Sequence, residues 1–280
     1  MTFGTVRLFE IQLDPDFYIL VFFSTLSSYC LHWYFTSEGL QIEKNELTSD
    51  SMINNQTITI INHTLPELRL TWNIKYKRIL LLLLIVSTII IGFIFLIRPI
   101  WIFFFMPTAI ATLIYTAPKL PISVFKKLEG KALAKTFYLT TIWTYVTCIL
   151  PLQVADAKIN KLAVLYITCQ FLFIYLICLL FDYRDRKKDN FNFIIINTNK
   201  HFNKIFQFIS GLFILILSVF YLITHNGVMT LSLLIGFLTV YSTSKKSINT
   251  SSDYWYYFTL DGLMALPVTV YILLTFLLNN

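Results

Sequence analysis

Apolar residues occur in this chain in long, nearly unbroken blocks, and no other feature constrains its structure as strongly. Of the 280 residues, 56% are apolar and only 13% are charged, whereas a soluble domain carries about 25% charged residues. A helix needs about 20 apolar residues to cross a bilayer core of about 30 Å. Because backbone groups in lipid must be paired within their own segment, these blocks predict helices and not open strands. We therefore expect an integral membrane protein of the all-α class.

The number and position of the blocks predict a polytopic bundle of about eight transmembrane helices. The expected spans are 17–35, 79–97, 100–117, 137–154, 163–181, 205–223, 228–243 and 256–278. We expect residues 1–280 to form a single transmembrane domain. Residues 1–16 would be an extracytoplasmic segment, and 36–78 and 182–204 would be cytoplasmic loops.

The basic residues predict an orientation. With these spans, all but four of the 22 Lys and Arg residues fall in the loops after the first, third, fifth and seventh spans. Short cytoplasmic loops are enriched in Lys and Arg, so the amino terminus is expected outside. The basic residues are scattered over several loops and do not line one helix, which excludes nucleic acid as an expected partner.

Three carboxylates stand together after the fifth span. Asp182, Asp185 and Asp189 are spaced so that a continued helix would carry them on one face. Magnesium prefers one or two carboxylates together with water and substrate phosphates, so the stripe could hold a diphosphate through a bridging metal. The alternative is a solvated helix end whose acids pair loosely with neighbouring Arg and Lys residues. Spacing alone does not decide between them.

Two further polar features lie on the predicted cytoplasmic side. Pro118 ends the third span and is followed by several lysines, among them Lys119 and Lys135, which could bind an anion or serve only as a positive-inside loop. Asp261 is expected one to two turns inside the eighth span, where a carboxylate is costly and faces the bundle, a water-filled space or a neighbouring helix. Few other deep charges occur, which argues against a small-solute transporter.

These features together resemble the UbiA superfamily of intramembrane prenyltransferases. The second aspartate motif of that family is matched by Asp182, Asp185 and Asp189, and its Tyr-Ser/Thr-Ala-Pro element by Tyr115 to Pro118. Asp261-Gly262 is similar to the start of the family's last helix. The resemblance implies a bundle of transmembrane helices around a lipid-accessible cavity, with a metal-bound diphosphate at its cytoplasmic mouth.

The resemblance also implies a reaction and roles for residues. A prenyl group would pass from a prenyl diphosphate to a lipophilic acceptor in a bacterial cytoplasmic membrane. Asp182 and Asp185 would bind Mg²⁺, with Asp189 in support. The residues implied in substrate binding are Lys119, Lys135, Tyr115, His32 and Asp261.

One departure keeps the enzymatic interpretation open. The family's first aspartate motif falls at Tyr29 to Tyr34, which contains His32 but no carboxylate, and the family's first helix has no counterpart. Losing one motif removes about half of the expected carboxylate ligands, and a departing diphosphate needs metal or cationic stabilisation. The alternatives are therefore a catalytically inactive protein of the same fold that binds a lipid or a partner, and a small-solute transporter.

Overall fold

The structure, a computed structural model, describes residues 1–50, 75–116, 132–185, 199–249 and 259–279. Those residues are almost entirely helical, and no strand occurs among them. The prediction of an all-α protein is confirmed at this level.

Five helices in the described part of the chain are long and apolar enough to cross a membrane, as expected of an integral membrane protein. They are Lys77–Ile97, Thr136–Val154, Lys161–Tyr183, Phe202–Thr224 and Gly227–Ser244. Trp101–Ile114 and Gly262–Leu278 are shorter apolar helices at two more of the expected spans. The first expected span lies in α2 (Pro15–Asp50), whose backbone continues as helix into the segment predicted as a loop. A total of eight spans stays a prediction.

The chain divides into two compact units. The small unit is Asp14–Glu129, and the large unit combines Met1–Leu13 with Gly130–Asn280. A hairpin of long helices forms the first, whereas the second joins the beginning of the chain to its second half.

In the small unit, α2 packs along α5 (Lys77–Ile97) and also contacts α6 (Trp101–Thr116). A polar clamp ties the beginning of α2 to the α5–α6 turn, because Arg98 Nη2 donates to Asp14 Oδ2 at 2.7 Å. The same guanidinium lies 5.7 Å from the centre of the Trp101 ring, and the buried Phe17 meets that ring edge-on. Trp and Arg are typical anchors at a membrane–water boundary.

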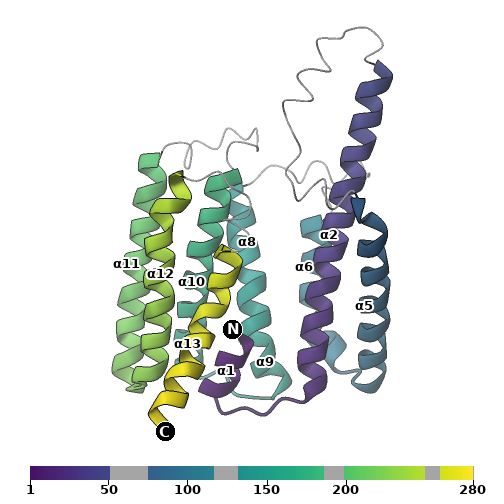
Figure 1. The fold of residues 1–280 in the computed structure, drawn as a ribbon. Helices are drawn as coiled ribbons and strands as arrows, with labels where there is room; N and C mark the ends of the chain where they lie inside the picture. The colour runs from purple at the N-terminus through teal and green to yellow at the C-terminus, as the bar shows by residue number, and fades with distance from the viewer. Residues whose placement is uncertain (51–74, 117–131, 186–198, 250–258, 280) are drawn as a thin grey trace. The chain divides into compact units, whose positions relative to one another are not determined.

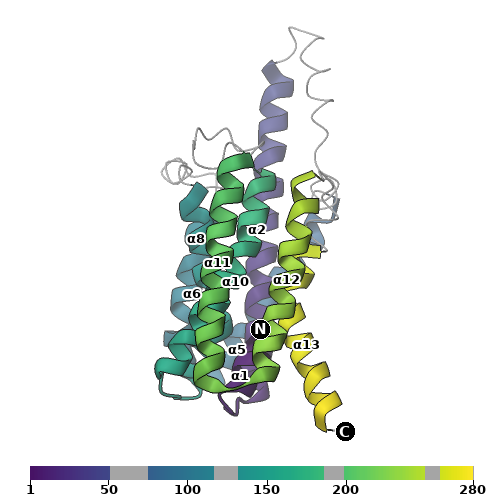
Figure 2. The ribbon, with the colours of Figure 1, turned by 90° about the vertical axis from the view of Figure 1, so that its left-hand side faces the viewer.

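The large unit is a bundle whose helices pack mainly against α10 and α12 (Figures 1 and 2). α10 contacts α8, α11 and α12, and α13 lies along α12. The bounds are α1 (Thr2–Leu8), α8 (Ala132–Thr144), a π-helical segment (Tyr145–Ile149), α9 (Leu150–Val154), α10 (Lys161–Asp185), α11 (Asn199–Thr224), α12 (Gly227–Asn249) and α13 (Asp261–Asn279). Apolar side chains of α10, α11 and α12 fill most of the interior.

The π-helical segment between α8 and α9 follows from a proline. Pro151 has no N–H, so the carbonyl of Thr147 loses the donor that an α-helix would give it, and the local π turn interrupts the regular ladder. The short helix α1 reaches into the bundle at this point, and Thr5 Oγ1 donates to Thr147 O at 2.8 Å. α1 therefore docks where the backbone needs a donor.

Two glycines let helices approach closely. A Cβ on Gly236 of α12 would lie 2.7 Å from Cγ of Pro267 in α13, a distance that no relaxed structure allows. A Cβ on Gly4 of α1 would lie 3.2 Å from the Tyr166 hydroxyl of α10. Small residues serve this purpose between membrane helices, because close packing replaces the hydrophobic effect there.

Replacing Thr5 with Val should destabilise the large unit by about 1–3 kcal/mol. Valine has nearly the size of threonine but no hydroxyl, so the buried carbonyl of Thr147 loses its donor. Thermal unfolding in lipid nanodiscs measures the effect. Thr5→Ser keeps the hydroxyl and should recover most of the loss. Thr88→Val, on an exposed position of α5, is the matched control, and an equal loss in both Val variants would contradict the role given to Thr5.

Replacing Gly236 with Ala should cost about 1–3 kcal/mol, because a proline ring cannot turn away from the added methyl group. Gly211→Ala on α11 is the control, since a Cβ there meets nothing within 4 Å. That variant should be neutral or stabilised by up to about 1 kcal/mol from its higher helix propensity. The two melting temperatures in the same detergent provide the comparison.

Candidate functional site

Asp182 lies close to the carboxyl end of α10, where the apolar span gives way to charged residues. Its side chain is half-buried, and its Oδ2 atom is fully enclosed. The next residue, Tyr183, is buried and packs against Phe202 of α11 with ring centres 4.4 Å apart. The carboxylate therefore stands at the rim of the packed apolar core and keeps one side open.

Aromatic rings lie on the same face of α10 as Asp182, toward the beginning of the helix. Tyr175 is seven residues before Asp182, which is two helical turns or about 10 Å, so the two residues lie on the same face of the helix. Phe171 stacks on Tyr175 with ring centres 6.0 Å apart. Phe137 of α8 meets Phe171 edge-on at 5.4 Å. We call Phe137, Phe171 and Tyr175 the aromatic ladder.

The ladder is accessible, since Phe171 and Tyr175 are only partly buried and Phe137 is 58% exposed. Its faces carry negative charge density and attract cations. This arrangement suits a ligand with two parts. An anionic head would bind to the carboxylate through a cation, and an apolar or cationic body would lie along the aromatic rings.

Two more of the predicted site residues share this end of the large unit. Asp185 is the last residue of α10, one turn beyond Asp182, and Lys135 lies in the first turns of α8, which runs antiparallel to α10. Asp261 is the first residue of α13 and follows two π-helical residues, and because residues 250–258 lie outside the described part, its depth in the eighth span stays a prediction. The side chains of these three residues lie outside the described part.

For the other predicted residues no geometry relative to Asp182 is described. Asp189 and Lys119 lie outside the described residues, and Tyr115 and His32 belong to the small unit. His32 is on α2, with an enclosed Nδ1 atom and its ring 5.4 Å from that of Trp33. Within the described residues no three His, Cys, Asp or Glu side chains form a group that could hold a metal.

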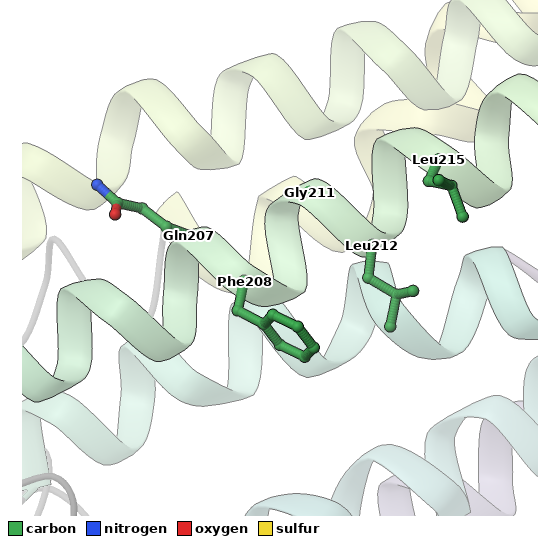
Figure 3. Close-up of a pocket in the computed structure, with 5 residues that line it drawn as sticks. All are labelled: Gln207, Phe208, Gly211, Leu212 and Leu215. Atoms are coloured by element: carbon green, nitrogen blue, oxygen red, sulfur yellow. The ribbon is translucent and has the colours of Figure 1, made fainter.

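A hollow of about 340 Å³ lies elsewhere, on the outer face of α11 (Figure 3). It is centred on Gly211 and bordered by Gln207, Phe208, Leu212 and Leu215. Gly211 is one of its lining residues, and Phe208 is 71% exposed. This surface faces away from the core of the large unit, so it does not extend the site at Asp182.

Sequence reasoning did not single out the aromatic ladder. The signal was present as an aromatic pair four residues apart, Phe171 and Tyr175, which an α-helix places on one face. Among the aromatic residues that the blocks contain, Phe103 proves strongly exposed and Tyr166 fully buried. Only the packing of α8 on α10 shows which rings gather below Asp182.

Comparison of this chain with family models, with curated proteins and with solved structures finds no match.

Proposed function

We propose that this integral membrane protein transfers a prenyl group from a prenyl diphosphate to a lipophilic acceptor. The observation that carries the proposal is the aromatic ladder, which begins two turns before the half-buried Asp182 on the same face of α10. The apolar chain of the substrate would lie along Phe137, Phe171 and Tyr175, and its diphosphate would lie at the charged end of α10.

The donor set at this end fits a magnesium diphosphate in its chemistry. Asp182 and Asp185, three residues apart on α10, would supply two carboxylates, which is the number that Mg²⁺ commonly takes from a protein when phosphates and water complete its shell. When bound, the metal would neutralise the charge of the leaving diphosphate. Lys135, at the same end of α8, would add a positive charge.

In the proposed reaction the allylic C–O bond breaks, the electron pair leaves with the diphosphate, and the carbon bonds to a nucleophilic atom of the acceptor. The acceptor then gives up a proton. The ring face of Tyr175, the ladder residue nearest to Asp182, would stabilise positive charge on the allylic carbon. Asp182 and Asp185 would hold the head group in register with that ring.

Replacing Asp182 with Asn should lower prenyl transfer by about 100-fold or more, because the amide keeps the shape but loses the charge that the metal requires. The assay follows radiolabelled C10, C15 and C20 prenyl diphosphates into lipid-extractable product in nanodiscs with Mg²⁺. Asp156→Asn is the matched control, since Asp156 is exposed in the loop before α10. Equal turnover of the wild type and Asp182→Asn would remove Asp182 from the mechanism.

The same assay distinguishes between an enzyme and a catalytically inactive protein that only binds a lipid. A lipid-binding protein would retain the labelled prenyl diphosphate without product and would do so equally well after chelation of Mg²⁺. That outcome would overturn the proposed transfer reaction.

Replacing Phe171 with Leu should raise the KM for prenyl diphosphate by about 5-fold, which corresponds to about 1 kcal/mol of lost ring contact. Phe208→Leu, on the outer face of α11, should leave the KM unchanged. A similar KM in both variants would show that the substrate does not lie along the aromatic ladder.

A further inference from the structure

The hollow on the outer face of α11 lies on a helix that is apolar and long enough to cross the membrane (Figure 3). Its apolar segment is Phe202–Thr224, and more residues of this segment are exposed than buried. The outer face is therefore open to the membrane, where either a lipid or another protein can fill the hollow. The polar groups next to the hollow decide which of the two fits better.

One stripe of α11 changes along its length from a charge through an amide to an apolar surface. Lys204, Gln207, Gly211 and Leu215 follow one another at spacings of three or four residues, so they share one side of the helix. All four residues are exposed. Figure 3 shows Gln207 at one end of the hollow and Leu215 at the other. The polar side chains of this stripe thus precede the hollow, which lies deeper in the span.

The stripe has about the length of one lipid leaflet. From Lys204 to Leu215 the helix rises about 16 Å, which is about half of the 30 Å core of a bilayer. Lys204 lies two residues after the beginning of the apolar segment, where a lysine can extend its ammonium group to the level of the head groups. Gln207 lies about 5 Å deeper. A phospholipid presents its charged head, its ester groups and its acyl chains in the same order.

A second copy of the chain matches this stripe less well. Copies in one membrane share an orientation, so a two-fold dimer along the stripe would bring each residue close to its own copy at the same depth. Lys204 would then face a like charge, which is repulsive. Membrane helices also associate through hydrogen bonds between them, but the exposed Ser218, one turn beyond Leu215, already donates to the carbonyl of Ile214 at 2.8 Å. Charge and hydrogen bonding therefore both favour a lipid.

We propose that this stripe binds one anionic phospholipid. The lipid phosphate accepts from the ammonium group of Lys204, and the amide of Gln207 donates to an ester carbonyl. One acyl chain lies in the hollow of about 340 Å³ beside Gly211, in contact with Phe208 and Leu215. The basic residues of the chain predict that this end of α11 faces the cytoplasm, where anionic lipids attract Lys and Arg side chains. The site is independent of the proposed prenyl transfer.

Native mass spectrometry of the full chain with added lipid tests the proposal. The probes are phosphatidylglycerol and phosphatidylcholine with identical acyl chains, which differ in the charge of the head group. One phosphatidylglycerol should stay bound with an affinity about 5-fold above that of phosphatidylcholine, as expected for one basic contact near the membrane surface. Equal affinities for the two lipids would overturn the proposal.

Replacing Lys204 with Gln should abolish the preference for phosphatidylglycerol, because the variant loses the charge that binds the phosphate. Lys204→Arg keeps the charge and should keep the preference. Lys161→Gln is the control, since Lys161 is an exposed lysine at the beginning of another apolar span. An unchanged preference in Lys204→Gln, or an equal loss in Lys161→Gln, would contradict the role given to Lys204.

Replacing Gly211 with Leu tests the hollow. A Cβ at Gly211 meets nothing within 4 Å, so the folded protein can accommodate a leucine, whose side chain then occupies the space of the acyl chain. The affinity for both lipids should fall by about 10-fold. Gly92→Leu on α5 should leave it unchanged, because Gly92 is also exposed and has the same open space around its Cβ position. Wild-type affinity in Gly211→Leu would show that the chain does not lie there.

Two further measurements distinguish the lipid from other occupants. Glycerol phosphate carries the charge of the head group without an acyl chain, so it should not displace phosphatidylglycerol at equal concentration. Displacement at equal concentration would show that the hollow takes no part in binding. The wild-type spectrum should contain single chains with one lipid. A lipid-free dimer that Gly211→Leu separates into single chains would show that a second copy covers the stripe, and would overturn the proposal.

Discussion

The need to pair every backbone polar group inside an apolar medium governs this structure. A carbonyl without a donor costs several kcal/mol in lipid, and Pro151, near the end of the apolar helix Thr136–Val154, removes the donor for the carbonyl of Thr147. The hydroxyl of Thr5, from another part of the sequence, supplies a donor to that carbonyl. This bond fixes α1 in the large unit, where Gly4 also lies close to the Tyr166 hydroxyl, which accepts from Gln170 Nε2.

The spans of the large unit could be predicted from the sequence because block length and hydropathy depend only on neighbouring residues. The helices 161–185, 199–224 and 227–249 contain the blocks expected at 163–181, 205–223 and 228–243. Helix ends were harder to predict, since the residues beyond a hydrophobic block can still favour helix, as after residue 35 in α2. The short helix α1 could not be predicted, because its stability comes from partners far along the chain and not from its own apolar content.

The candidate site was likewise only partly predictable from the sequence. Asp182 was identifiable because charged residues are scarce in such a chain, and the helix period correctly aligned it with Asp185 on α10. The aromatic ladder could not be identified from the sequence, because one of its three rings comes from α8. The spacing of residues along one helix does not show which other helix packs against it. Placement of His32 and Tyr115 in a different unit from Asp182 is likewise a property of tertiary packing.

The position of α1 has a consequence for how the protein is made. Thr2–Leu8 contacts α9, the π segment and α13, and Gly4 lies within van der Waals reach of Val268. A ribosome makes α1 before α9 and α13, so α1 can reach these partners only after both have been synthesised. The contacts that hold α1 in the large unit therefore form late in the assembly of that unit.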